Sequence, residues 1–217
     1  MLGRVHLITD SRPGADPVAQ VRALLPMATS DLVIQFRPAR DWSDRHVFEL
    51  GCEIAALCRT AGVKLLVNDR IDIAMAIAAD GAHVGASDLP VAAVRKLLGP
   101  GCLIGATVRS PVQARQAVAG GADYIGVGPC YGTSTKDSLP PPLGVAGLAA
   151  ITPLARAVAI GGITIQRVPA VMAAGAHGVA VVGAVADAPD PAAALAGLLA
   201  AVADPAAPTS RDTGPVS

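Results

Sequence analysis

The chain has 217 residues, enough to bury a large core, and 52% of them are hydrophobic while only 2% are aromatic. Its 17 basic and 17 acidic residues balance, so we expect no basic surface for nucleic acid or for a membrane. No apolar run approaches the roughly 18 residues of a membrane-spanning helix. The first ten residues predict a strand and a polar loop rather than a signal peptide, so we expect a cytosolic protein.

Short apolar stretches alternate with alanine-rich helical stretches along the whole chain. Strands are predicted at about 5–9, 32–37, 64–68, 82–85, 103–107, 124–127, 158–160 and 179–182. Helices are predicted at about 17–25, 43–60, 71–79, 90–98, 111–119, 145–154, 167–174 and 191–203. Eight such strand–helix units in about 200 residues favour an α/β fold, a compact closed (β/α)8 barrel.

Capping residues support these boundaries. Ser43 is placed to cap the second helix, and Pro17 and Pro111 each fall at a first helical position. Glycine is predicted to end several helices just before the next strand, at Gly62, Gly81, Gly121 and Gly175.

The motifs are spread over residues 1–203, which predicts a single domain, and the aperiodic stretch 204–217 is predicted to be a disordered tail. An open doubly wound sheet is the alternative fold, but no GxGxxG motif opens the first helix.

The segment 123–136, DYIGVGPCYGTSTK, organises the rest of the chain. A buried strand leads into a loop that carries two threonines, several backbone N–H groups and Lys136. These groups suit an oxyanion such as a phosphate ester, although a polar surface turn would look similar. A second segment, AIGGI at 159–163, also follows a strand and precedes a helix, so it is either a phosphate-binding turn or a plain tight turn. Because both loops follow neighbouring strands, we expect one shared site.

The residues at strand ends define the candidate site, because the active site of such a barrel lies at the carboxyl ends of its strands. Asp69 and Asp88 follow adjacent predicted strands, beside an amide and several cations. Two carboxylates there suit Mg²⁺ holding a pyrophosphate, although a helix N-cap at Asp69 and a solvated loop at Asp88 are the simpler alternatives. The strand-end set comprises Gln35, Arg37, Arg40, Asn68, Asp69, Arg70, Asp88, Thr107, Arg109, Thr133, Thr135, Lys136, Gly161, Gly162, Val182 and Gly183.

The four cysteines show neither a CxxC pair nor a histidine at ligand spacing, so we expect no zinc site. Cys52, Cys58 and Cys102 are predicted to be buried, reduced thiols. Cys130 falls in the organising loop and could line a pocket, but it has no obvious neighbouring base.

These motifs, taken together, resemble the thiamine phosphate synthase family over nearly the whole chain. The resemblance rests on QFR at 35–37, NDR at 68–70, HVG at 83–85 with DLP at 88–90, GAT at 105–107, the loop 123–136 and AIGGI at 159–163. The TxTK sequence after GVGP is the most specific of them. The resemblance implies a TIM-barrel enzyme that joins a pyrimidine methyl diphosphate to a thiazole phosphate, in which Mg²⁺ and a lysine draw off pyrophosphate.

The resemblance also implies residue roles. Asp69 and Asp88 would bind Mg²⁺, and Lys136 and Thr107 would be catalytic. Gln35, Arg37, Asn68, Thr107 and Lys136 would hold the pyrimidine diphosphate, with Arg40 as a possible addition. Thr133, Thr135, Gly162, Val182 and Gly183 would hold the thiazole phosphate. The partners are therefore small phosphorylated molecules, and the oligomeric state is left open.

The chain departs from the family pattern at a few positions. Ala39 stands where the family has lysine, with Arg40 one residue along, and Ala86 stands where it has glutamine. Arg109 replaces a frequent histidine and Gly183 a frequent serine. Two alternatives therefore stay open beside the synthase: a thiazole tautomerase-like paralogue, and a non-catalytic binder of thiazole phosphate or thiamine phosphate.

Overall fold

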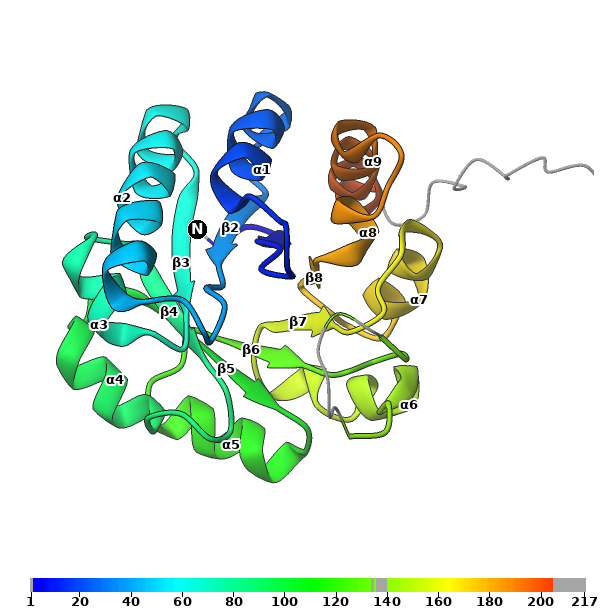
Figure 1. The fold of residues 1–217 in the computed structure, drawn as a ribbon. Helices are drawn as coiled ribbons and strands as arrows, with labels where there is room; N and C mark the ends of the chain where they lie inside the picture. Colours follow the sequence, from blue (N-terminus) through cyan, green and yellow to red (C-terminus); the bar gives the residue numbers. More distant parts are fainter. Residues whose placement is uncertain (1, 134, 136–139, 205–217) are drawn as a thin grey trace, which may run out of the picture.

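A computed structural model describes residues 2–133, 135 and 140–204 and has the predicted closed barrel of eight parallel strands. Figure 1 shows the strands at the centre and the helices outside them. The barrel closes where β1 pairs with β8, with Val5 opposite Val179. The strands are β1 Val5–Ile8, β2 Leu32–Phe36, β3 Lys64–Asn68, β4 Gly81–Val84, β5 Leu103–Val108, β6 Tyr124–Val127, β7 Ala157–Ile160 and β8 Gly178–Val181.

The helices follow the strands in sequence, and the last helix packs beside the first, so that the chain closes on itself. The α-helices are α1 Pro17–Leu24, α2 Asp44–Ala61, α3 Ile71–Ala76, α4 Val91–Leu98, α5 Pro111–Ala119, α6 Gly144–Ala149, α7 Val168–Ala173, α8 Gly183–Ala186 and α9 Pro191–Ala203. Three short 3-10 helices are η1 Leu25–Met27, η2 Thr152–Leu154 and η3 Ile165–Arg167. Of these helices, none is both long and apolar enough to cross a membrane. The predicted tail lies, beyond Asp204, outside the described residues.

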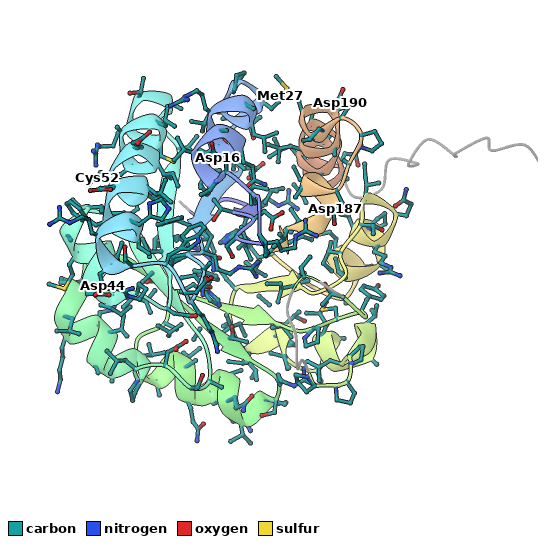
Figure 2. All side chains as sticks on the ribbon, viewed as in Figure 1. Asp16, Met27, Asp44, Cys52, Asp187 and Asp190 are labelled. Carbon is teal, nitrogen blue, oxygen red and sulfur yellow. The ribbon has the colours of Figure 1, made fainter. Side chains whose placement is uncertain are left out.

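The predicted start signals are confirmed. The side chain of Ser43 accepts a hydrogen bond from the His46 N–H at the start of α2. Asp16, labelled in Figure 2, and Ser110 cap α1 and α5 in the same way, each directly before a proline. These side chains satisfy N–H groups that a helix start leaves without an intrahelical partner.

One of the predicted end signals is wrong. Gly62 ends α2 in the left-handed conformation as expected, but Gly81 begins β4 instead of ending a helix. A β-carbon at Gly81 would lie 1.9 Å from the carbonyl oxygen of Leu103. This glycine therefore allows β4 and β5 to approach, and α3 ends five residues earlier at Ala76.

Other helices also differ from prediction. The helix predicted at 145–154 splits into α6 and η2, because Pro153 cannot continue an α-helix. The single-turn helix α8 was not predicted. Its four residues are too few to show a helical period.

Hydrophobic side chains fill two layers. The larger layer lies between the strands and the helices and includes Ile34, Val67, Ile104 and Leu198. The smaller layer fills the barrel and includes Val33, Leu66, Tyr124 and Val158. The barrel interior is therefore a packed core rather than a channel.

Candidate active site

A cavity of about 330 Å³ opens at the carboxyl ends of the strands, where the fold predicts an active site. Its walls come mainly from the ends of β5 to β8 and from the loops that follow them. Eight residues of the predicted strand-end set line it: Arg37, Thr107, Thr133, Thr135, Gly161, Gly162, Val182 and Gly183.

Two glycines on one side of the cavity adopt backbone conformations that other residues rarely reach. Gly161 and Gly162 have φ angles of 91° and 63°. A β-carbon on Gly162 would lie 2.3 Å from the carbonyl oxygen of Gly132, and one on Gly161 would lie 2.5 Å from Cβ of Pro129. The loop after β7 therefore packs directly on the loop after β6. Backbone hydrogen bonds join the same loops, from Cys130 N–H to Ile160 O (2.7 Å) and from Tyr131 N–H to Gly161 O (3.0 Å).

Hydroxyl groups face this glycine turn. The hydroxyls of Thr133 and Thr135 lie 3.0 Å apart. Thr135 also reaches the end of β8, since a β-carbon on Gly183 would lie 3.2 Å from its methyl carbon. Two hydroxyls and the backbone of two glycine-bearing turns thus converge on one part of the cavity, an arrangement that suits a phosphate group.

Two arginines that had no assigned role support these loops. Arg167 donates to the carbonyl oxygen of Gly162 (2.5 Å), and its guanidinium lies 4.3 Å from the ring centroid of Tyr131. Arg109 donates to the carbonyl oxygens of Gly128 (2.9 Å) and Pro141 (2.7 Å). Arg167 lines the cavity and Arg109 does not. Arg109 therefore follows β5 as expected, but its side chain holds the loop after β6 instead of facing the cavity.

An amide pair and a half-buried arginine lie at the carboxyl ends of β2 and β3, and of these three residues Arg37 lines the cavity while Gln35 and Asn68 do not. The buried Gln35 donates to the side-chain oxygen of Asn68 at 2.7 Å. The backbone N–H of Arg37 donates to the Thr9 hydroxyl at 2.9 Å. Burial lowers the pKa of Arg37, while the charges of Asp10 and Asp69 raise it. Arg40 is exposed and does not line the cavity.

The two predicted metal ligands follow adjacent strands. Asp69 comes directly after β3, is exposed and has a φ of 64°, and its N–H donates to the His83 carbonyl oxygen at 2.8 Å. The Oδ2 atom of Asp88, past the end of β4, accepts from the Gly85 N–H at 2.7 Å. Across the part of the chain that the structure describes, no three His, Cys, Asp or Glu residues form a group that could hold a metal ion.

A charged bridge at the rim was missed in the sequence. Arg12 lies 2.7 Å from a carboxylate oxygen of Asp10 and 2.5 Å from one of Asp187. Asp187, labelled in Figure 2, lies directly after α8. The hydrogen bonds from Arg12 hold the pKa of Asp10 below its usual value. Asp187 also lines the cavity. This bridge ties the loop after β1 to the segment after β8, which no sequence spacing could indicate.

Two loop residues complete the placement. Lys136 lies outside the described residues. Cys130 is buried, does not line the cavity, and its thiol donates to the Val127 carbonyl oxygen at 3.3 Å. Burial raises the pKa of Cys130 to about 11. The expectation that Cys130 could face the pocket is therefore wrong.

Known proteins are similar to this chain over most of its length. Residues 5–185 match the family described as thiamine monophosphate synthase. A thiamine-phosphate synthase of Salinispora arenicola is 50% identical over 185 residues, which are 84% of this chain and 89% of that protein. Its counterpart in Salinispora tropica is 47% identical with the same coverage.

A solved structure is also similar. The thiamine phosphate pyrophosphorylase of Pyrococcus furiosus superposes with a TM-score of 0.81 and 31% identity, and the match covers 94% of this chain and 97% of that one. A 3-hexulose-6-phosphate synthase at 19% identity and a TM-score of 0.63 shares the fold.

Proposed function

The chain belongs to the thiamine monophosphate synthase family, and from this premise we propose that its cavity joins a pyrimidine methyl diphosphate to a thiazole phosphate, releasing pyrophosphate. It is an enzyme of the transferase class. The observation that carries the assignment to this cavity is the meeting of the Thr133–Thr135 hydroxyls with the Gly161–Gly162 turn, in a cavity that Arg37 and Thr107 also line.

The phosphate of the thiazole binds between the loops after β6, β7 and β8. Thr133 and Thr135 supply hydroxyls, and Gly162, Val182 and Gly183 supply backbone at the cavity wall. For the reaction to occur, the ring nitrogen of a thiazole held there has to face the pyrimidine methyl carbon. The pyrimidine diphosphate then occupies the remaining part, near Thr107, Arg37, Gln35 and Asn68.

The chemical step is departure of pyrophosphate followed by capture of the pyrimidine methyl carbon by the thiazole nitrogen. Charge builds on the leaving oxygens, so groups already aimed at them lower the barrier most. Arg37 supplies a permanent positive charge and Thr107 a hydroxyl at the cavity wall. Lys136, in the same loop as Thr135, is the further cation that we assign to the leaving group.

Asp69 and Asp88 are the residues that would hold Mg²⁺. Mg²⁺ keeps several waters and takes one or two protein carboxylates together with substrate phosphates. A pair of carboxylates after adjacent strands fits that mode of Mg²⁺ coordination. Among the described residues, no group of three or more His, Cys, Asp or Glu side chains could hold a metal ion. Mg²⁺ bound there would neutralise charge on the departing pyrophosphate.

The departures from the family pattern bear on the alternative functions. Arg109, where the family often has histidine, already donates to two carbonyl groups, and a guanidinium, unlike an imidazole, has no accepting nitrogen. It therefore cannot exchange a proton with a substrate, which disfavours a tautomerase that would rely on that position.

One assay separates the three functions. Purified protein is mixed with the pyrimidine diphosphate and the thiazole phosphate, with Mg²⁺ or with a chelator, and thiamine phosphate is detected by mass. We expect product only with Mg²⁺ and both substrates. In a parallel incubation with a thiazole carboxylate phosphate and no diphosphate, isomerisation would identify a tautomerase. Calorimetric binding of the thiazole phosphate without turnover in either incubation would identify a non-catalytic binder.

A further inference from the structure

Three polar side chains inside the barrel form a chain of hydrogen bonds that ends at the cavity. The His83 ring on β4 has Nδ1 at 2.9 Å from the hydroxyl of Tyr124 on β6, and Nε2 at 2.9 Å from the hydroxyl of Thr107 on β5. His83 is 7% exposed and Tyr124 is 1% exposed. Thr107 lines the cavity, so the chain leads from the barrel core to the ligand space.

Two glycines, one on β5 and one on β6, make this contact possible because they have no side chain. His83 pairs in register with Gly105, and Gly105 pairs with Tyr124, so the three form one row across β4, β5 and β6. A β-carbon on Gly105 would lie 2.1 Å from Cζ of Tyr124 and 2.4 Å from Nδ1 of His83. On β6, a β-carbon on Gly126 would lie 2.9 Å from Cε1 of His83. Both glycines leave room for the two rings to meet across β5.

The phenol of Tyr124 decides where the protons lie. Burial raises the pKa of Tyr124, so the phenol keeps its proton. Within the described part of the chain, its hydroxyl has His83 as its hydrogen-bond partner. The neighbouring His6 packs against the same ring, with centroids 5.0 Å apart, but no hydrogen bond joins the two residues.

The proton on Tyr124 must therefore go to Nδ1 of His83, since a buried hydroxyl without an acceptor is strongly disfavoured. A neutral His83 then carries its hydrogen on Nε2 and donates to the oxygen of Thr107. Thr107 accepts that bond and keeps its own hydrogen. In the reverse tautomer, His83 would carry its hydrogen on Nδ1. Thr107 would then donate its own hydrogen to Nε2 of His83, and the phenol of Tyr124 would have no acceptor.

We propose that Tyr124 and His83 are positioning residues that hold the Thr107 hydroxyl as a hydrogen-bond donor toward the cavity. Such a hydroxyl favours a ligand group that only accepts, such as a phosphate or diphosphate oxygen. The proposed function supplies the identity of that ligand, while the direction of the hydrogen bonds follows from the barrel interior.

The tautomer of His83 can be observed directly. Protein labelled with ¹⁵N in its four histidines is studied by NMR at pH 8, and the His83 signals are assigned by their loss in His83→Gln. We expect Nε2 to carry the hydrogen in the native protein, and Tyr124→Phe to shift His83 toward the Nδ1–H form. A native His83 with its hydrogen on Nδ1 would overturn the proposal, whatever the protein catalyses.

Kinetics test the consequence at the cavity. We expect Tyr124→Phe and Thr107→Val each to lower kcat/KM about tenfold, as for the loss of one oriented hydrogen bond, and the double variant to be no worse than Thr107→Val alone. Thr107→Ser should keep the dependence on Tyr124. Thr152→Val, which removes a hydroxyl bonded to Ala174 O far from the cavity, should leave kcat/KM unchanged. Independent, additive losses from Tyr124→Phe and Thr107→Val would refute the coupling.

If no turnover is found with any substrate pair, calorimetric binding of inorganic pyrophosphate replaces kcat/KM. Equal affinity in native protein and Tyr124→Phe would then count against the proposal, and weaker binding in Tyr124→Phe would support it. Failure of the proposed function and failure of this inference thus give different results.

Discussion

Replacing Gly162 by alanine tests whether the close approach of two loops forms the phosphate side of the cavity. Gly162 has a φ of 63°, and its β-carbon would lie 2.3 Å from the Gly132 carbonyl oxygen. The left-handed backbone costs a residue with a side chain about 1–2 kcal/mol. Forcing a methyl group against a packed neighbour typically costs a further 1–3 kcal/mol, so we expect a total loss of about 2–5 kcal/mol.

Gly62 provides a matched control. Its φ is 67°, but no atom lies within 4 Å of the position its β-carbon would take. It ends α2, at the opposite end of the barrel from the cavity, since each helix runs back to the start of the next strand. Gly62→Ala should therefore lose only the backbone contribution of about 1–2 kcal/mol.

Urea unfolding and substrate kinetics separate the two effects. We expect Gly162→Ala to raise KM for the thiazole phosphate about tenfold or more, as for one lost hydrogen bond to a charged group, with KM for the pyrimidine diphosphate nearly unchanged. Gly62→Ala should leave both KM values at the native level. Equal stability and equal KM values in the two variants would refute the packing argument.

Further expectations concern charge. Asp69→Asn, which keeps a side chain that tolerates a left-handed backbone, should lower kcat about a hundredfold with an unchanged circular dichroism spectrum, because Asp69 is exposed; native turnover would exclude it as a metal ligand. Arg40→Ala should lower kcat/KM about tenfold while Ala39→Lys changes it little, measured side by side in the coupling assay; full activity in Arg40→Ala would show that Arg40 does not replace the family lysine. Burial lowers the pKa of His6 from 6.5 to about 3, so between these pH values the unfolded chain binds a proton that the folded protein does not. The free energy of unfolding should therefore fall by about 1.4 kcal/mol per pH unit as the pH is lowered from 6.5 toward 3; urea titrations should show a flatter pH dependence in His6→Gln, and identical slopes would contradict this assignment.

The order of the strands and several boundaries could be predicted because local signals agree with the fold. Helix α5 begins and ends where the sequence places it, since Ser110 and Pro111 fix its first turn. Gly81 was misassigned because a glycine that ends a helix and a glycine that lets two strands approach look alike in sequence. The distinction depends on Leu103, more than 20 residues away.

The site was predicted in part for the same reason. The carboxyl ends of the strands are known once the strands are, so Thr107, Thr133 and Gly162 could be placed at the cavity from sequence. The directions of side chains could not. Arg167 turns back onto the Gly162 carbonyl and packs on the Tyr131 ring of another loop, and Arg12 reaches a carboxylate 175 positions along the chain. The contacts with Tyr131 and Asp187 are tertiary, so no local pattern indicates them.

The contacts of Arg109 have a consequence for the entropy of ligand binding. A loop loses conformational entropy when its two ends are brought together, and either folding or ligand binding must offset that free-energy cost. Because one guanidinium holds the carbonyls of Gly128 and Pro141, the two stems of the loop after β6 are joined when the barrel folds. A ligand that reaches Thr133 and Thr135 therefore meets a segment whose ends are already fixed. The ligand then does not have to offset the entropy of bringing the loop ends together, so more of the interaction energy appears as affinity. A histidine at this position has fewer hydrogen-bond donors and would leave more of the ordering to the ligand.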